Sequence, residues 1–352
     1  MKFSLFYFAH SAQTPGTDYE LLFEGARFAD SAGLHAVWTP ERHFHEFGGQ
    51  FPNPAVTAAA LATMTSNVQL RAGSLVAPLH DPIRIAEEWA MVDRMSGGRV
   101  GISFASGWRQ QDFALADRPF QERRHVTERT IDTVRALWSG GSVIRPDPSG
   151  APVEIETFPR PVQSELPVWL TTGGRTDTYR TAGSLGANVL THLLGQDLDR
   201  LRANITAYRT SYRRYAGGPE RGSVTVMLHT FLGADRDEAR SSCIGPIANY
   251  LRGSMDLWAA GDLGAGADLK QLSSADLDFV LGRATDRLLD EATAIGSVAS
   301  VQGLLGSLAD CGVDEIACLI DFGVEPQAVL ASLPLIAELA QGTNPVHSEV
   351  YA

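Results

Sequence analysis

The sequence alternates between short runs rich in β-branched and aromatic residues and longer segments whose apolar residues recur at helical spacing. This alternation predicts eight strands separated by about eight helices. The expected strands are 2–8, 35–38, 68–76, 100–104, 166–171, 187–191, 223–232 and 314–322. Strict alternation of this kind is typical of an α/β fold of the closed (β/α)8 type, the TIM barrel, here as a single domain over residues 1–342.

A doubly wound sheet is the alternative arrangement of alternating strands and helices. Sheets of that type that bind dinucleotides carry a GxGxxG motif directly after a strand. No expected strand of this chain is followed by that motif. We therefore predict the barrel.

Glycines mark where several of the expected helices end. The segment 82–95 carries Ile85, Trp89, Val92 and Met95 on one helical face. Glycine is favoured just after a helix because it adopts the left-handed conformation without strain. Helices are accordingly expected at 18–32, 82–95 and 119–139, followed by Gly33, Gly97-Gly98 and Gly140-Gly141.

Two segments exceed what a minimal barrel requires. Residues 141–165 are proline-rich and predict an excursion before the fifth strand, and residues 252–296 form a glycine-rich insertion after the seventh. A long insertion at the carboxyl end of a barrel strand commonly covers the active site, so 252–296 is a candidate lid. The alternative is a solvated loop that packs on the flank of the barrel. Residues 343–352 are expected to form a loose tail.

Composition excludes several classes of partner and mechanism. The formal net charge of −12 argues against nucleic acid. No apolar stretch approaches the roughly 20 residues of a membrane span, and the N-terminus is a poor signal peptide. Three cysteines without metal-type spacing fit a reduced, cytoplasmic setting. The only lysines, Lys2 and Lys270, are poorly placed for Schiff-base catalysis.

Ionisable residues collect where the expected strands end. In a (β/α)8 barrel the loops after the strands meet at one rim, which carries the active site. These positions are Glu41, Arg42, His43 and His45 after the second strand, His80-Asp81, residues 103–108, residues 171–178, Thr191-His192, His229 and Asp321. The sequence therefore predicts one clustered site at the carboxyl end of the barrel.

A metal site is one interpretation of this rim. His43 and His45, with His192, His229 and Asp321, resemble the ligands that hold zinc in barrel metallohydrolases. Those hydrolases place their His-x-His on the first strand, and many use a bridging lysine that this chain does not supply. The His-x-His pair alone therefore does not establish a metal site.

Two glycine turns favour a flat, phosphorylated ligand instead. The turn TTGGRTDT (171–178) leads into a helix, where exposed backbone N–H groups and the helix dipole attract a phosphate. The turn SFASGW (103–108) consists largely of small residues, which allow the backbone to approach a ring closely.

Together these stretches resemble the bacterial luciferase-like, flavin-dependent monooxygenases, in particular the branch associated with natural-product biosynthesis. The resemblance extends over residues 1–340. It rests on WTPERHFHEFG (38–48), RAGSLVAPLHDPIRIAEEW (71–89), DRMSGGRVGISFASGW (93–108), LPVWLTTGGRTDT (166–178), ANVLTHLLGQ (187–196) and GVDEIACLIDFG (312–323).

The resemblance implies a barrel that binds FMN at its carboxyl mouth. Such enzymes take reduced flavin from a separate flavin reductase, form a flavin C4a-hydroperoxide with O2, and transfer one oxygen atom to the substrate. It also implies a cis peptide bond between Gly73 and Ser74, beneath the flavin ring. The cofactor-binding residues expected from it are Gly73, Ser74, Ala105, Ser106, Gly107, Thr172, Gly173, Gly174, Arg175, Thr178 and His192.

Departures from the luciferase pattern change the expected chemistry. The luciferase histidine pair corresponds to Arg42-His43, its reactive cysteine to Ala105, and a phosphate-contacting arginine to Ser106. Aldehyde oxidation with light emission is therefore not expected, and Arg175 becomes the candidate for neutralising the phosphate.

The catalytic candidates lie in the loop after the second strand. His43 or His45 would be the acid/base group, because an imidazole with a usual pKa of about 6.5 exchanges protons at neutral pH. Arg42 would orient an anionic or carbonyl group of the substrate; its alternative is a salt bridge to Glu41 or Glu46.

Other expectations concern partners and alternatives. The substrate is expected to be a small molecule, free or tethered to a carrier protein. Alanine-rich residues 54–66 are expected to form a homodimer interface, as the resemblance implies. Related barrels bind a deazaflavin and transfer hydride without O2, which is the main alternative; a flavin-storing or partner-binding barrel without activity is a further one.

Overall fold

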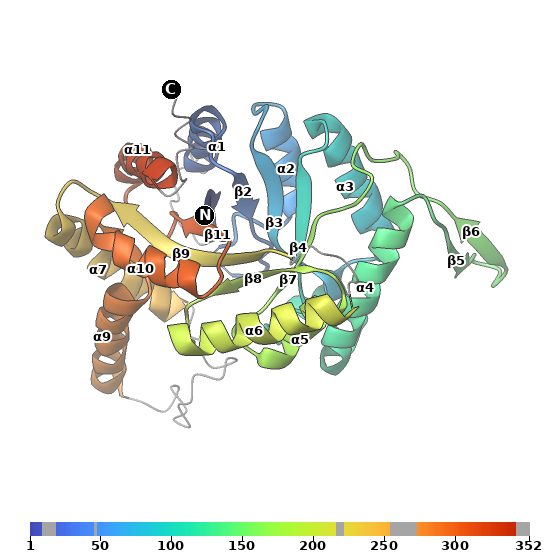
Figure 1. The fold of residues 1–352 in the computed structure, drawn as a ribbon. Coiled ribbons are helices and arrows are strands. Elements are labelled where there is room, and N and C mark those ends of the chain that lie inside the picture. Colours follow the sequence, from blue (N-terminus) through green and yellow to red (C-terminus); the bar gives the residue numbers. More distant parts are fainter. Residues whose placement is uncertain (9–18, 46–47, 216–221, 254–272, 343–352) are drawn as a thin grey trace.

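Eight parallel strands close into a barrel surrounded by helices, as the alternation of the sequence predicts (Figure 1). The computed structural model describes residues 1–8, 19–45, 48–215, 222–253 and 273–342. The ring runs β1-β2-β3-β4-β7-β8-β9-β11 and returns to β1. The strands are β1 (Lys2–Phe6), β2 (Ala36–Thr39), β3 (Gln69–Val76), β4 (Val100–Ala105), β7 (Val168–Thr171), β8 (Asn188–His192), β9 (Val224–Leu232) and β11 (Glu315–Leu319).

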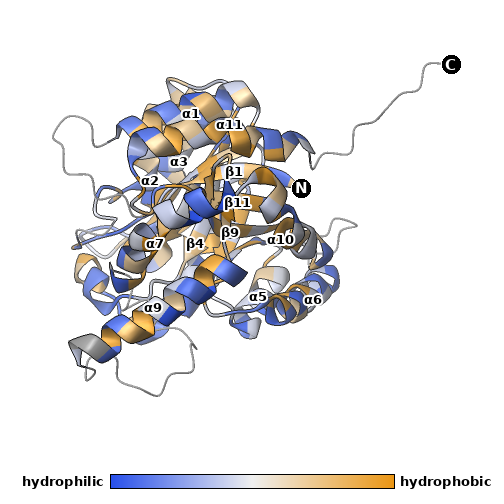
Figure 2. Ribbon diagram, turned by 90° about the vertical axis from the view of Figure 1, so that its left-hand side faces the viewer, coloured by the Kyte–Doolittle hydropathy of each residue, from blue (hydrophilic) through white to orange (hydrophobic). Residues whose placement is uncertain are grey.

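Helices cover the outside of the barrel and bury their apolar faces against it. Hydrophobic residues concentrate on the strands and on the helix faces toward them (Figure 2). The helices are α1 (Glu20–Ala32), α2 (Pro54–Ala62), α3 (Pro82–Ser96), α4 (Arg123–Trp138), α5 (Thr176–Ser184), α6 (Leu198–Tyr215), α7 (Arg236–Gly253), α9 (Ser274–Glu291), α10 (Val298–Asp310) and α11 (Pro326–Gly342).

The glycine stops lie close to where the sequence predicts them. Helix α1 ends at Gly33 (φ 73°) and α3 at Gly97 (φ 71°), both left-handed caps. Helix α4 begins at Arg123 rather than 119, because Phe120–Glu122 form a separate 3-10 turn after Pro119.

The two additional segments differ in character. Residues 141–165 contain an antiparallel hairpin, β5 (Val143–Pro146) and β6 (Pro152–Ile155), which projects from the barrel beside α4 (Figure 1). The insertion 252–296 contributes α9 and a short strand, β10 (Ala294–Gly296), parallel to the end of β9. Residues 254–272 and the tail 343–352 lie outside the described residues, so the lid remains a prediction.

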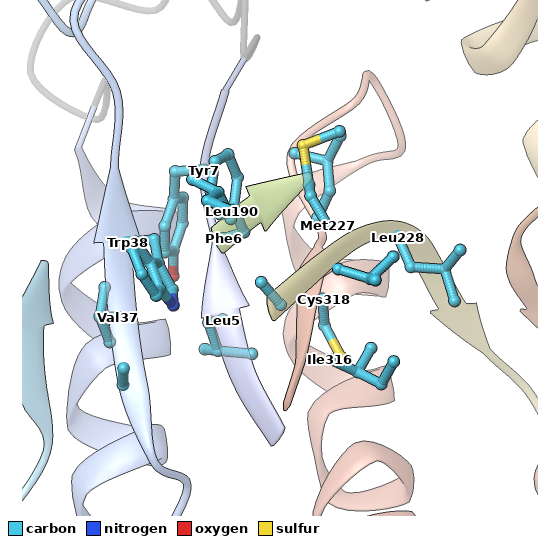
Figure 3. Packing of buried hydrophobic residues seen from close by; sticks show 14 of the residues in the cluster. Leu5, Phe6, Tyr7, Val37, Trp38, Leu190, Met227, Leu228, Ile316 and Cys318 are labelled. Carbon is cyan, nitrogen blue, oxygen red and sulfur yellow. The ribbon is translucent and has the colours of Figure 1, made fainter. Parts of the chain in front are cut away.

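The barrel interior is packed with apolar side chains from several strands. Figure 3 shows Phe6 of β1, Trp38 of β2 and Met227 of β9, which share the inner face with Ser4, Glu315 and Thr225, together with Leu5 and Ile316, which alternate with them and pack on the outer face of the barrel. All five are less than a tenth exposed.

One ion pair crosses the interior of the barrel between β3 and β11. Arg71 Nη1 donates to both carboxylate oxygens of Glu315, at 3.2 and 2.9 Å. Ser4 Oγ (2.5 Å) and Trp38 Nε1 (3.1 Å) also donate to Glu315 Oε1. The guanidinium lies over the rings of Trp38 (4.9 Å) and Trp169 (4.4 Å). Burial alone would raise the pKa of Glu315, but Arg71 and the other donors hold it below its usual value.

This pair generates a stability prediction. Glu315→Ala leaves the Arg71 charge buried without its partner, so we expect the free energy of unfolding to fall by about 3–5 kcal/mol. The measurement is the midpoint of urea unfolding followed by circular dichroism. Glu24→Ala is the control: its pair with Arg27 is about half exposed, and its loss should cost less than about 1 kcal/mol. Equal losses from the two variants would contradict the prediction.

Candidate active site

Glu41, in the loop after β2, is hydrogen-bonded to groups from three parts of the rim. Its Oε1 accepts from His43 Nε2 at 2.8 Å and from His80 Nε2 at 2.6 Å. Its Oε2 accepts from the backbone N–H of Val76 at 2.7 Å. Burial alone would raise the pKa of Glu41, but these hydrogen bonds hold it below its usual value. Glu41 is therefore a buried, ionised carboxylate at neutral pH.

Arg42 points into the rim between aromatic side chains. It is 8% exposed, and its guanidinium lies 4.8 Å from the ring centre of Phe8 and 5.6 Å from that of Trp108. Burial lowers the pKa of Arg42 to about 10, so it remains a cation at neutral pH. Of its two expected salt-bridge partners, Glu41 has both oxygens engaged by other groups, and Glu46 lies outside the described residues.

The two histidines of the loop after β2, His43 and His45, occupy different environments. The side chain of His43 is 13% exposed and faces Glu41, whereas His45 is exposed. Arg109 Nη1 donates to the carbonyl of His43 at 3.0 Å and ties this loop to the segment after β4. His43 is thus held in a defined position by Glu41 and Arg109.

The peptide bond between Gly73 and Ser74 is cis, which confirms the expectation for β3. A Cβ at Gly73 would lie 2.6 Å from the Phe6 ring, so only glycine fits there. Ser74 Oγ lies 2.5 Å from Thr171 Oγ1, which lies 2.7 Å from Ser103 Oγ. These contacts join β3, β4 and β7 below the mouth of the barrel.

The turn after β4 is shaped by Gly107. Ala105, Ser106 and Gly107 are half-buried. Gly107 has φ 78°, and a Cβ there would lie 3.0 Å from both Phe113 and Val76. Glycine is therefore required at position 107 by the packing of Phe113 and Val76, and the approach of a flat ligand to this turn stays a prediction.

The turn after β7 is fixed by polar side chains from the following elements. Asn204 Nδ2 donates to the carbonyl of Gly174 at 3.1 Å, and Thr176 Oγ1 donates to Asn204 Oδ1 at 2.7 Å. Gly173 lies against the imidazole of His192. Arg175 is exposed at the start of α5, and Thr178 is half-buried one turn further on. The structure thus brings Gly173 and His192 together.

Three buried polar atoms near this turn have no hydrogen-bond partner among the described residues. They are Thr172 Oγ1, His192 Nδ1 and His229 Nε2. Burial lowers the pKa of His192 to about 4 and that of His229 to about 3, so both imidazoles are neutral at pH 7. Buried polar atoms are normally hydrogen-bonded, so these three are available to a ligand.

Arg123, at the start of α4, is a candidate site residue that the sequence did not single out. Its Nε donates to the carbonyl of Gly107 at 3.1 Å, and its Nη1 to that of Phe120 at 3.0 Å. Burial, followed by the nearby charges of Arg124 and Arg175, lowers its pKa. Arg123 of α4 and Arg175, at the start of α5, therefore lie close enough for their charges to repel. The Arg123-Arg124 pair just after the SFASGW turn was the sequence signal.

The described residues provide no set of side chains that would support the metal interpretation. Within the described ranges, no three His, Cys, Asp or Glu side chains converge closely enough to hold an ion. Asp321, one of the ligands that interpretation requires, accepts a hydrogen bond from the backbone N–H of Phe8 at 2.7 Å.

No described helix is both long enough and apolar enough to span a membrane.

Comparison with known proteins decides the family. Residues 1–315 match the family model described as luciferase-like monooxygenase. The chain belongs to the luciferase-like monooxygenase family. Its sequence is 26% identical over 345 residues to the oxygenase component of the flavin-dependent trigonelline monooxygenase of Acinetobacter baylyi, covering 95% of this chain and 92% of that protein.

Solved structures share the fold of this luciferase-like chain. The oxygenating constituent of 3,6-diketocamphane monooxygenase from Pseudomonas putida, a type II Baeyer–Villiger enzyme in complex with FMN, has a TM-score of 0.78 and 18% identity, covering 97% of this chain and 98% of its own. An F420-dependent secondary alcohol dehydrogenase has a TM-score of 0.73 and 14% identity, covering 98% of this chain and 99% of its own. At these identities the likeness establishes the fold alone.

The two buried histidines generate a prediction for acid stability. In the unfolded chain they bind protons as the pH falls through a pKa of about 6.5, whereas in the folded chain His192 stays neutral until about pH 4 and His229 until about pH 3. The free energy of unfolding should therefore decrease as the pH is lowered from about 6.5 to about 4. His229→Phe, which keeps an aromatic ring beside Tyr250, should make this slope shallower by up to about 1.4 kcal/mol per pH unit.

The measurement is urea unfolding at a series of pH values. His125→Phe removes an exposed histidine from α4 and should keep the wild-type slope. An unchanged slope in His229→Phe would show that His229 does not remain neutral in the folded protein.

Proposed function

We propose that this luciferase-like chain is the oxygenase component of a two-component monooxygenase, which binds reduced FMN from a separate reductase and uses O2 to oxygenate a small organic or carrier-bound substrate. The observation that carries the proposal is the set of three unpartnered buried polar atoms, on Thr172, His192 and His229, beside the glycine positions of the mouth. The family membership and the oxygenase component from Acinetobacter baylyi support it.

The residues at the mouth fit a flat ring that carries a phosphate. Gly73 and Gly107 are required by the packing of the mouth, because Phe6 and Phe113 occupy the space that a side chain at these positions would need. Thr172 and His192 offer a hydroxyl and a neutral imidazole for hydrogen bonds to polar ring atoms. Arg123 and Arg175 would neutralise the phosphate, at the N-terminal end of α5.

Bound reduced flavin would supply the electrons that activate O2. His43, held by Glu41, would hold or accept a proton at its remaining ring nitrogen, Nδ1. Arg42, enclosed by Phe8 and Trp108, would orient an anionic or carbonyl group of the substrate. The neutral His192 and His229 add hydrogen-bonding capacity on the opposite side without adding charge.

A role in natural-product biosynthesis in the cytoplasm is part of the proposal. It rests on the resemblance of the sequence motifs and on the cysteines Cys243, Cys311 and Cys318, which are all free thiols.

A deazaflavin-dependent hydride transfer is the second candidate. The observation behind this candidate is the fold that the chain shares with an F420-dependent alcohol dehydrogenase. Either cofactor would occupy the same mouth of the barrel. Oxygen distinguishes the two candidates. A monooxygenase loses turnover when O2 is removed, whereas a deazaflavin enzyme does not.

Flavin binding generates the main prediction. Anaerobic titration should give a Kd for reduced FMN in the micromolar range or below, measured by absorbance or calorimetry. Arg123→Ala and Arg175→Ala should each weaken binding by roughly 10-fold or more, because each removes a charged contact to the phosphate.

Arg180→Ala is the matched control for this experiment. Arg180 lies on α5 like Arg175 but is exposed and paired with Asp177 at 3.1 Å, so FMN affinity should stay the same. The absence of binding by either redox form of FMN would refute the proposal.

The homodimer generates a further prediction. Val56 on α2 and Met91 and Met95 on α3 are exposed apolar residues on neighbouring helices, with 65%, 47% and 52% of their surface accessible. We propose that a second copy covers this face. Wild-type protein should show a dimer mass by light scattering, and Val56→Lys with Met91→Lys should show a monomer mass, because buried lysines are costly.

The control for the dimer places a lysine elsewhere. Tyr215→Lys, at the end of α6 on the other side of the barrel, should keep the wild-type mass (Figure 1). A monomer mass for the wild-type protein at micromolar concentration would refute the dimer.

A further inference from the structure

Glu41 is shared by two histidines through a single oxygen atom. The Nε2 atoms of His43 and His80 both lie within hydrogen-bonding distance of Oε1, at 2.8 and 2.6 Å. The side chain of Glu41 has no solvent exposure, whereas those of His43 and His80 are 13% and 27% exposed. One buried carboxylate oxygen thus accepts hydrogen bonds from two imidazoles.

The ionised carboxylate fixes the tautomer of both rings. A carboxylate without a proton can only accept hydrogen bonds, so each Nε2 must carry the hydrogen. In the neutral form of His43, Nδ1 is then the nitrogen that can accept a proton. Without Glu41, either nitrogen could carry the hydrogen.

The shared charge also couples the two histidines. When His80 is protonated it forms an ion pair with Glu41, and the field that Glu41 exerts on His43 is largely neutralised. When His80 is neutral, the full negative charge acts on His43. This difference is large because the carboxylate is buried, where charges are weakly screened.

We propose that Glu41 and His80 are positioning residues for His43, and that the protonation of His80 decides how much of the Glu41 charge acts on His43. Glu41 holds the ring and its tautomer, and His80, at the more exposed end of the trio, responds to the pH of the solvent. The catalytic meaning of this coupling rests on the proposed function, in which His43 is the acid/base group.

Other charged groups face the trio from the elements around it. Burial lowers the pKa of His80, but the hydrogen bond and charge of Glu41, with a smaller contribution from Glu88 of α3, raise it above its usual value. Asp112, from the turn after β4, faces His43, and Arg42 and Arg109 face Asp112. Glu41 alone of these groups is hydrogen-bonded to both histidines among the described residues.

The test is an NMR titration of histidine-labelled full-length protein without flavin or substrate. The His43 ring resonances should show an inflection at the pH where His80 titrates, because coupled groups report each other's protonation. Glu41→Gln should lower the His80 midpoint by at least about one pH unit, since burial remains and the ion pair is lost. Its His43 15N shifts should change from the Nε2–H tautomer to a mixture of both.

His80→Gln keeps a hydrogen-bond donor toward Glu41 but cannot titrate. In this variant the inflection of the His43 resonances should disappear, and in His125→Gln, which changes an exposed histidine on α4, it should remain. Persistence of the inflection in His80→Gln, or its absence in the wild type, would overturn the proposal. The wild-type titration decides the coupling even if a variant does not fold.

A second readout uses the flavin-loaded protein. The rate at which bound FMNH2 is reoxidised by O2, followed by stopped-flow absorbance, should change at the His80 midpoint in wild type and His125→Gln but not in His80→Gln. If the protein binds no FMN, the proposed function fails while the NMR titration still decides the coupling. If it binds FMN and the step persists in His80→Gln, the inference fails.

Discussion

The buried ion pair between Arg71 and Glu315 is the constraint on which the barrel depends. Two charges inside an apolar barrel are tolerated only when they are paired and fully hydrogen-bonded, and here Ser4 of β1, Trp38 of β2 and Arg71 of β3 all donate to the carboxylate of Glu315 on β11. This requirement fixes the register of β3 against the other strands. Because side chains alternate along a strand, Gly73, two residues after Arg71, faces the same interior. The ion pair near the amino end of β3 thus sets the position of the Gly73–Ser74 bond, which lies toward the carboxyl end of the same strand.

The mouth of the barrel has two electrostatic halves. After β2 and β3 the groups form a charged hydrogen-bonded cluster: the pKa of Glu41 is lowered and that of His80 is raised, because the two are paired. On β8 and β9 the imidazoles of His192 and His229 are neutral, because burial disfavours their charged forms. A ligand between the halves would meet proton-exchanging groups on one side and fixed hydrogen-bonding groups on the other. This asymmetry gives a physical basis for separating acid/base work from cofactor binding.

Local signals in the sequence were sufficient for the elements but not for the contacts. All eight barrel strands appear, and the helix ends at Gly33 and Gly97 were readable because a left-handed glycine cap is a local property. The role of Glu41 was not readable: it was considered only as a partner for Arg42, whereas it is hydrogen-bonded to His43 and His80. The second of these lies 39 positions away in sequence. Arg123 was missed for the same reason, since its relation to Gly107 and Arg175 depends on how three loops meet.

The sequence by itself determined the alternation of strands and helices. The resemblance of its motifs indicated the family and the cis peptide bond between Gly73 and Ser74. These follow from periodicity, turn chemistry and short motifs, all of which act over a few residues. The tertiary structure alone decided which ionisable groups share a charge, which histidines are buried and neutral, and that His45 is exposed while His43 is held. The physical reason is that pKa values and hydrogen bonds depend on distances of a few ångströms between residues far apart in the chain. Those distances exist only once the barrel has closed.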